Sequence, residues 1–348
     1  MNKLIEKLIC TLAAIAIFPA FSVAQKTLIN QPPKPVSVVP VVIVNFPEPR
    51  PFPNFGAPYS NTSEKSIKVD SAVNVSLDCV SDAKIKINGW KRNEVRVFSE
   101  GGSEFGFKVL QKSSKTGDPV WIKIVGVPSY NKYKTAGDCV SGGEIEIDLP
   151  LNATVNISGR EVVTRIDSVK RVKVETIGGD ITLRRISEGI TASAGVGDIT
   201  VEGSNGSMML DSTTGNILVF EADPSEIGDI FKAKTHSGAI FLQRVSHRQI
   251  DLISISGSVA FSSEILSGGS YRMSTTKGSI LMSIPADSSG QIVANYGYGT
   301  FNSEIPIKIA TETISEGPLK TTVGTFGKGG DAILKLASNN GSISIKKL

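Results

Sequence analysis

The stretch Thr176-Ile177-Gly178-Gly179-Asp180-Ile181-Thr182-Leu183 carries a phrase that recurs through the second half of the chain. The phrase returns as Gly197-Asp198-Ile199-Thr200-Val201 and again as Gly215-Asn216-Ile217-Leu218-Val219. Each copy has a glycine, a polar residue and then apolar residues at alternate positions. Alternation with a period of two is typical of a β-strand with one buried face, and its recurrence indicates a repeat architecture.

Eight glycines anchor this repeat at spacings of 18, 18, 23, 19, 21, 21 and 42 residues. The anchors are Gly179, Gly197, Gly215, Gly238, Gly257, Gly278, Gly299 and Gly341. The positions seven and five before each anchor, and two and four after it, are apolar in 31 of 32 cases, Ser303 being the exception. Because only 40% of the chain is apolar, chance does not produce this pattern. Each unit therefore holds two short strands joined by a glycine corner.

One such unit cannot bury its apolar face, whereas stacked units share a continuous core. We therefore expect an all-β fold, a parallel β-solenoid (β-helix) over about 143–348 with about 18–23 residues per repeat. Its expected core column is Ile181, Ile199, Ile217, Ile240, Val259, Ile280 and Ile343. The alternative is one hairpin per unit, which gives an antiparallel meander or sandwich. Between Gly299 and Gly341, Pro306, Pro318 and the Gly-rich segment 324–330 predict a loop or hairpin that folds back as a cap.

The N-terminus has the pattern of a secretory signal peptide over residues 1–24, with two lysines, an apolar run over 8–21 and small residues before Gln25. An uncleaved anchor is the alternative, but the run is shorter than the ~20 residues of a membrane span. No later segment is long and apolar enough to span. Residues 25–65 are predicted to be a Pro-rich linker, extended or disordered, because nine of the 27 residues over 32–58 are proline. Residues 66–150 are predicted as the β-rich N-terminal part of the solenoid domain, and residues 151–348 as the repetitive solenoid.

Two cysteines remain after signal cleavage, in the matching phrases Asp78-Cys79-Val80-Ser81 and Asp138-Cys139-Val140-Ser141. Alternating strands, Lys84-Ile85-Lys86-Ile87 and Glu144-Ile145-Glu146-Ile147, follow them at the same offset of 60. We expect these strands to be neighbours in register, which pairs opposite charges and brings Cys79 and Cys139 within disulfide reach. Two full rungs inserted between them would instead hold the cysteines about 14 Å apart.

Candidate chemical residues are few. The formal net charge is +4, and Lys and Arg are spread along the chain, so a nucleic-acid partner is not expected. His236 and His247 lie in no metal or triad motif, and both are expected on the surface. Stacked Asp180 and Asp198 could hold Ca²⁺ or act as acid and base, but aspartates at tight corners commonly bond their own backbone, and that role is expected here. No catalytic residue, metal site or cofactor is predicted.

The repeated phrase, Gly89-Trp90 leading into Glu94-Val95-Arg96-Val97, and the closing Gly341-Ser342-Ile343-Ser344-Ile345 resemble the bacterial "putative adhesin" family of exported β-solenoid domains over about 66–348. The resemblance implies a non-catalytic, envelope-associated role and supplies no functional residues. We therefore expect a non-enzymatic exported envelope or surface protein, an adhesin-like binding scaffold located in the periplasm, at the cell surface or secreted. Its partner would be a cell-surface glycan or an envelope protein. The alternatives are a polysaccharide-active β-helix enzyme and an envelope-stress accessory acting through a membrane partner.

Overall fold

The computed structural model describes residues 62–127, 139–226, 228–314 and 318–348. The predicted signal peptide, and the predicted linker up to residue 61, lie outside these residues. The described part of the chain is all β-strand and turn, without a helix, and therefore without a helix that could cross a membrane.

The strands of the described residues form one 26-stranded sheet. The N-terminal strands are β1 (Thr62–Lys68), β2 (Asn74–Trp90), β3 (Glu94–Glu100), β4 (Phe105–Lys112), β5 (Pro119–Gly126), β6 (Val140–Ser141) and β7 (Glu144–Pro150). The central strands are β8 (Thr154–Asp167), β9 (Arg171–Gly178), β10 (Ile181–Arg184), β11 (Gly189–Val196), β12 (Ile199–Asn205), β13 (Ser207–Thr214), β14 (Ile217–Asp223), β15 (Ile230–Ser237), β16 (Ile240–Val245), β17 (Gln249–Ser256), β18 (Val259–Ser262), β19 (Ser270–Lys277) and β20 (Ile280–Ile284). The C-terminal strands are β21 (Gly290–Tyr296), β22 (Phe301–Ser303), β23 (Ile307–Ile314), β24 (Lys320–Phe326), β25 (Ile333–Asn340) and β26 (Ile343–Lys347).

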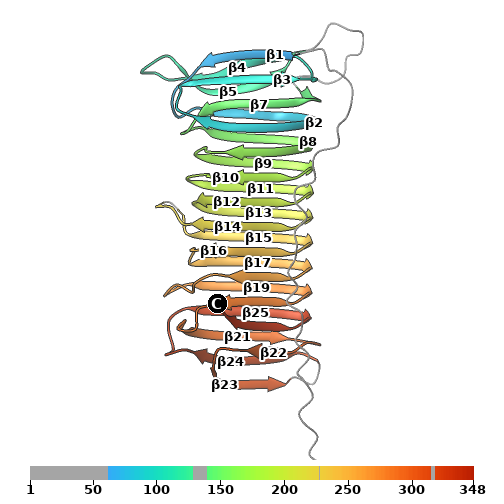
Figure 1. The fold of residues 1–348 in the computed structure, drawn as a ribbon, viewed down its shortest axis with the longest axis vertical. Helices are drawn as coiled ribbons and strands as arrows, with labels where there is room; N and C mark the ends of the chain where they lie inside the picture. Colours follow the sequence, from blue (N-terminus) through green and yellow to red (C-terminus); the bar gives the residue numbers. More distant parts are fainter. Residues whose placement is uncertain (1–61, 128–138, 227, 315–317) are drawn as a thin grey trace, which may run out of the picture. The chain divides into compact units, whose positions relative to one another are not determined.

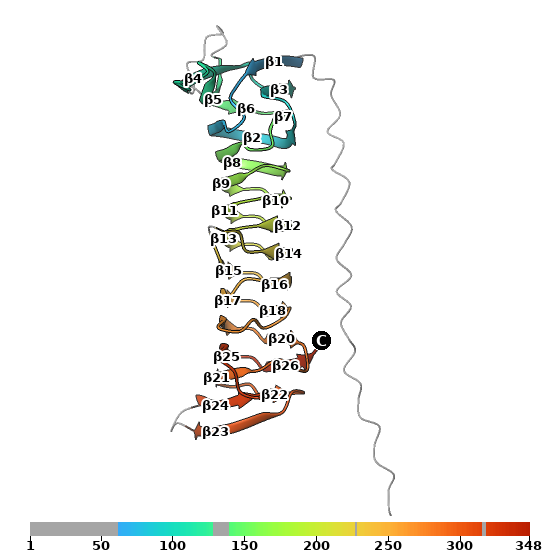
Figure 2. The same ribbon diagram turned by 90° about the vertical axis from the view of Figure 1, so that its left-hand side faces the viewer.

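Successive central strands alternate between two parallel ladders. The first ladder runs β8-β9-β11-β13-β15-β17-β19-β25-β21. The second runs β8-β10-β12-β14-β16-β18-β20-β26-β22. Figure 2 shows them on opposite sides of the stack. A strand of the first ladder and the next strand, in the second, are called a rung here. The parallel register contradicts the alternative of one antiparallel hairpin per unit.

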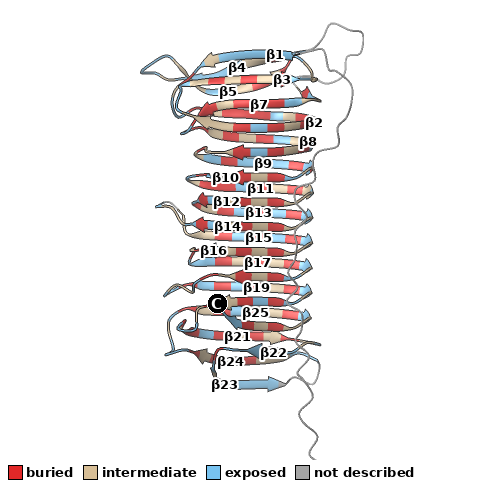
Figure 3. Cartoon of the chain, in the orientation of Figure 1, coloured by how far each residue is buried: buried red, intermediate tan, exposed pale blue. Residues whose placement is uncertain are grey.

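The core lies between the ladders, because alternate residues of each strand point inward (Figure 3). Ile181 lies opposite Ile199 in register, and Ile199 opposite Ile217. The pairing continues through Ile240, Val259 and Ile280 to Ile343, and all seven side chains are fully buried.

The anchor glycines form corners that stack on one another with little space between them. A Cβ atom on Gly215 would lie 2.0 Å from the carbonyl oxygen of Gly197, and one on Gly257 would lie 1.9 Å from that of Gly238. No side chain fits at such a distance from backbone. The repeat of glycine along the sequence therefore follows from the stacking of corners.

The last rung does not lie at the end of the stack. β25 pairs with both β19 and β21, so the final rung is inserted between two earlier ones (Figure 1). In the core, Ile343 accordingly separates Ile280 from Phe301. The predicted cap is the antiparallel hairpin β23–β24, whose β24 covers the other edge of β21. In sequence order, the cap hairpin β23–β24 therefore precedes the inserted rung β25–β26.

Among the described strands, β23 pairs with β24 alone and is the outermost strand at this end. In this pairing Ala310 lies between Ile309 and Thr311 without a partner, which is a bulge. Glu312 lies opposite the buried Thr322, and so occupies the inner face of the sheet.

At the N-terminal end, β2 lies between β8 and the strands β5, β6 and β7. Lys84 and Lys86 lie opposite Glu144 and Glu146, and the Lys86 Nζ is 2.6 Å from the Glu146 Oε1. This hydrogen bond raises the pKa of Lys86 and lowers that of Glu146. Strands β3 and β4 lie outside the β2–β7 pairing, so the intervening chain leaves the matched strands adjacent.

Cys79 and Cys139 form a disulfide, with their Cα atoms 4.6 Å apart. One boundary differs from the prediction, because β1 begins at Thr62, inside the segment 25–65 assigned to the linker. The last proline before it is Pro58, so from residue 62 the backbone is free to pair with β3.

Candidate functional site

The aspartates that follow the anchors stack as corner residues. The Asp198 N–H donates to the Asp180 Oδ1 at 2.9 Å, and the Asn216 N–H donates to the Asp198 Oδ1 at 2.7 Å. The Ala239 N–H donates to the Asn216 Oδ1 in turn, at 2.9 Å. Each side chain thus accepts a backbone hydrogen bond from the next rung. The sequence predicted a corner role through bonds to their own backbone, whereas these bonds come from the backbone of the next rung. The described residues contain no group of three metal-ligating side chains.

A second set of polar side chains, which the sequence reading missed, lies inside the stack three residues before the anchors. Its members are Thr176, Ser212, Thr235, Ser254, Thr275 and Ser338, all buried. From Ser212 onward, each hydroxyl donates to the carbonyl oxygen of the anchor glycine one rung earlier, at 2.8–3.1 Å. The recurrence of Ser or Thr at this position was the available signal. These hydroxyls hold the corners and are not exposed to a ligand.

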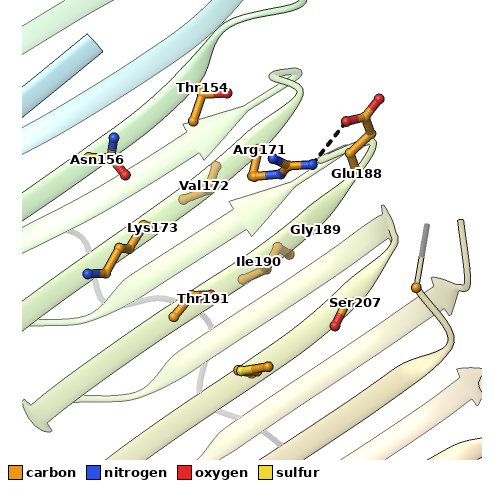
Figure 4. Close-up of a pocket in the computed structure, with 12 residues that line it drawn as sticks. Thr154, Asn156, Arg171, Val172, Lys173, Glu188, Gly189, Ile190, Thr191 and Ser207 are labelled. Atoms are coloured by element: carbon orange, nitrogen blue, oxygen red, sulfur yellow. Dashed lines mark hydrogen bonds and ion pairs between the residues drawn. The ribbon is translucent and has the colours of Figure 1, made fainter. Parts of the chain in front are cut away.

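A hollow of about 360 Å³ opens on the outer face of the first ladder, over β11 (Figure 4). The alternate, outward positions of β11 before the exposed Val196 carry small residues: Gly189, Thr191, Ser193 and Gly195. The neighbouring strand β9 presents Arg171, Lys173, Glu175 and Ile177 at the same register positions, and β13 presents Ser207, Met209, Asp211 and Thr213. One strand of small side chains thus lies between two strands with larger ones. We call this depression the β11 trough.

The β11 trough has a basic wall. The Glu188 carboxylate lies 3.1 Å from the Lys170 Nζ and 3.3 Å from an Arg171 Nη, and the Lys173 Nζ lies 2.9 Å from the Glu175 Oε1. Three cationic side chains therefore share two carboxylates. Arg171 and Lys173 remain about half exposed, so their remaining N–H donors are accessible to solvent.

The other wall and the far end of the trough are partly apolar. Met209 is 49% exposed beside the floor, while Ile177 and Val196 are exposed at the end of β9 and β11. The loop at Gly228 packs directly on Ser207, since a Cβ atom on Gly228 would lie 2.8 Å from the Ser207 Cβ. The hollow is therefore bounded beside Ser207, and its lining on β11 runs from Gly189 to Thr191.

A second hollow, of about 390 Å³, lies where the second-ladder strands β12 and β14 end, before the chain turns into the next strand of the first ladder. Gly203 provides the space, because nothing described lies within 4 Å of where its Cβ would be. Glu221 and Asp223 line this hollow, and Glu221 forms an ion pair with Arg244. Both members of the pair are about 60% exposed. These carboxylates are solvated rather than enclosed, which does not favour a role as a tuned acid or base.

The two histidines differ in their surroundings. His236 is exposed, as predicted. His247 was also expected on the surface, and that prediction is wrong, because the side chain is fully buried. Its Nε2 lies 2.8 Å from the Gly206 carbonyl oxygen and its ring packs edge-on against Phe231, while Nδ1 has no hydrogen-bond partner among the described residues. Burial lowers the pKa of His247.

No model of a protein family matches the chain, and no curated protein matches it. Among solved structures, the chain resembles a putative adhesin from Bacteroides fragilis, with a TM-score of 0.39 and 12% identity over 84% of this chain and 99% of that one. It also resembles a putative lipid binding protein from Parabacteroides distasonis (TM-score 0.33, 15% identity, 82% and 97% covered). A putative cell adhesion protein from Clostridium sporogenes is similar at a TM-score of 0.24 and 11% identity, over 83% and 100% of the two chains. Two of these three solved proteins are thus named for adhesion and one for lipid binding.

Proposed function

We propose that this protein is a non-enzymatic, exported binding scaffold of the cell envelope or surface. Its stacked rungs form a parallel β-solenoid, and the β11 trough is its binding surface. The partner is a cell-surface glycan. The observation that carries the proposal is the trough itself, a line of small side chains between two walls of larger ones on an otherwise regular ladder.

The position of β11 in the sheet supports a glycan over a β-strand as the partner. β11 is an inner strand that pairs with β9 on one edge and β13 on the other. Its backbone groups are therefore already paired and cannot receive an added peptide strand. A ligand in the trough is bound by side chains, through the hydroxyls of Thr191 and Ser193 and the charged groups of β9.

Two features support export, and each is typical of proteins that leave the cytoplasm. The predicted signal peptide, residues 1–24, directs the chain out of the cytoplasm, and the disulfide between Cys79 and Cys139 is typical of oxidising compartments. In this proposal the Pro-rich linker separates the signal peptide from the binding domain, which comprises the N-terminal part to residue 150 and the repetitive part over 151–348. The mature protein then acts in the periplasm, at the cell surface or in the medium.

A non-enzymatic role is favoured over a polysaccharide-active enzyme by the carboxylates of the trough. Of those described at its basic end, Glu188 is held by Lys170 and Arg171, and Glu175 is held by Lys173. Glu175 lies in register with Asp211 of the other wall, across Ser193, but it is already held by Lys173, whereas glycoside hydrolysis needs a carboxyl group that is free to transfer a proton. Incubating the protein with polysaccharide and measuring new reducing ends tests this part, and the proposal expects none above a protein-free control.

Blocking the trough tests the binding surface. Thr191 lies on the floor, so T191W should fill the trough and lower the binding of the labelled mature protein to intact cells or isolated envelopes at least tenfold. T276W is the matched control, because Thr276 is also exposed on the first ladder but lies four strands away on β19. Equal binding by wild type, T191W and T276W would overturn the assignment of the trough.

A further inference from the structure

The rung β25–β26 occupies a gap between two rungs that follow each other directly in the sequence. β25 pairs with β19 on one edge and with β21 on the other (Figure 1), and β26 pairs in the same way with β20 and β22. Residues 285–289 alone connect the two flanking rungs. We call the gap between them the rung slot. Its occupant is known, because β25–β26 fills it.

Both sides of the rung slot present the same register to the inserted rung. Leu334 of β25 lies opposite Tyr271 on one side and opposite Ile292 on the other. The anchors of the flanking rungs, Gly278 and Gly299, are 21 residues apart, a spacing that also separates Gly278 from the anchor before it. The flanking rungs thus have the pattern of ordinary neighbours. While the slot is empty, each presents an unpaired edge that can receive a rung.

The contacts that hold the inserted rung come from the two flanking rungs. The Ser338 hydroxyl donates to the Gly278 carbonyl oxygen at 2.9 Å. Four apolar side chains of the rung are buried in the slot: Leu334, Leu336, Ile343 and Ile345. A second copy of the chain has identical flanking rungs. Exchange of β25–β26 between two copies therefore preserves each of these contacts, which is the condition for domain swapping.

The segment 327–332, which connects the cap hairpin to the inserted rung, is suited to act as a hinge. Three of its six residues are glycine, and Gly327 and Gly329 have φ angles of +62° and +72°. Nothing described lies within 4 Å of the Cβ position of Gly329. Because glycine adopts many backbone conformations without steric cost, this segment can extend and carry the rung to another molecule.

We propose that β25–β26 is an exchangeable rung, which leaves its own slot and enters the rung slot of a second copy of this chain. Residues 327–332 are the hinge, and each slot of the resulting dimer holds the other copy's rung in the register described above. The exchange replaces contacts within one molecule by the same contacts between two, so a high protein concentration favours it. This self-assembly is independent of the ligand that the β11 trough binds.

Introduced cysteines distinguish an exchanged rung from one in its own slot. Ser274 of β19 lies opposite Ala337 of β25, and both are partly exposed. Adjacent strands are about 4.8 Å apart, within the range that a disulfide spans. The variants S274C and A337C are mixed and unfolded in guanidinium at low pH, where thiol exchange is slow. They are then refolded together at high protein concentration and oxidised with diamide.

Exchange predicts a disulfide between position 274 of one copy and position 337 of another, identified by mass spectrometry with one variant isotopically labelled. The matched control mixes I253C with S274C, because Ile253 lies opposite Ser274 on the other edge of β19 and neither belongs to the exchanged rung. The 274–337 disulfide should form in at least tenfold higher yield than the control disulfide. Equal yields would overturn the proposal.

A locked variant tests exchange by a second measurement. S274C/A337C, oxidised before unfolding, ties the rung to its own slot and should remain a monomer in light scattering after refolding. Wild type should form a dimer whose fraction rises with protein concentration. Equal dimer formation by the locked variant would show that copies associate through another surface, which also overturns the proposal. If either single variant does not fold by circular dichroism, the exposed Arg272 and Lys335, which lie opposite each other on the same strands, provide a second cysteine pair.

Discussion

Gly257 tests whether the closeness of stacked corners selects glycine in this repeat. A Cβ atom on this residue would lie 1.9 Å from the Gly238 carbonyl oxygen and 2.5 Å from its carbon. Gly257 does not have a positive φ, so an alanine there is disfavoured by contact alone. Because the obstacle is backbone, the corner must move away from the rung before it.

The cost of G257A follows from this displacement. Forcing extra volume into a packed site costs about 1–3 kcal/mol. The Gly238 N–H donates to the Ser256 carbonyl oxygen at 3.1 Å, and the Gly238 carbonyl accepts from the Ser254 hydroxyl at 2.9 Å, across the gap that would open. We expect both hydrogen bonds to be lost, at about 1 kcal/mol each. G257A should therefore lower the free energy of unfolding by about 3–5 kcal/mol.

The assay is guanidinium unfolding followed by far-UV circular dichroism, with linear extrapolation to water. G203A is the matched control, because Gly203 has a φ of +53° and nothing described within 4 Å of its Cβ position. It should cost only the left-handed backbone penalty of about 1–2 kcal/mol. A loss in G257A no larger than that in G203A would refute the argument, since backbone conformation and not stacking distance would then select the corner glycines.

Three further predictions concern other parts of the structure. Burial lowers the pKa of His247 below its ordinary 6.5, so the unfolded chain binds a proton more readily than the folded one. The contribution of His247 to stability should therefore be full above pH 6.5 and fall as the pH drops toward the folded-state pKa. In H247F the denaturation midpoint should change less between pH 7 and pH 5.5 than it does in wild type. On the edge strand β23, we expect the charges of Lys308 and Glu312, together with the bulge, to prevent pairing with another copy. K308V/E312V should therefore self-associate in light scattering, and a monomer at all concentrations would contradict that role. Replacing Cys79 and Cys139 with alanine opens a loop with a sequence separation of 60 and should cost about 4 kcal/mol in the chain-entropy account, whereas an unchanged denaturation midpoint would show that the disulfide does not stabilise the fold.

Much of the candidate site depends on features that the sequence shows only in part. The outward positions of β9, β11 and β13 recur every 18 residues, and Gly189, Thr191 and Ser193 are visibly small. Their role as a floor depends on register with two neighbours, because the same residues on an edge strand would form no trough. The buried hydroxyls, by contrast, were readable, since Ser or Thr recurs three residues before most anchors.

The residues alone were sufficient to predict the strands, their inward faces, the parallel stacking and the cysteine pair. The physical reason is that apolar alternation and corner glycines are both selected by contacts between adjacent rungs, so the same residue pattern recurs in each copy of the repeat. Tertiary structure alone decided the order of the last rungs and the burial of His247. The alternating pattern of β25–β26 would allow this rung to pair with several others. Its place between the rungs of Ile280 and Phe301 depends on where the hairpin β23–β24 folds. His247 is buried because Gly206 and Phe231, which are 41 and 16 residues away in the sequence, surround its ring.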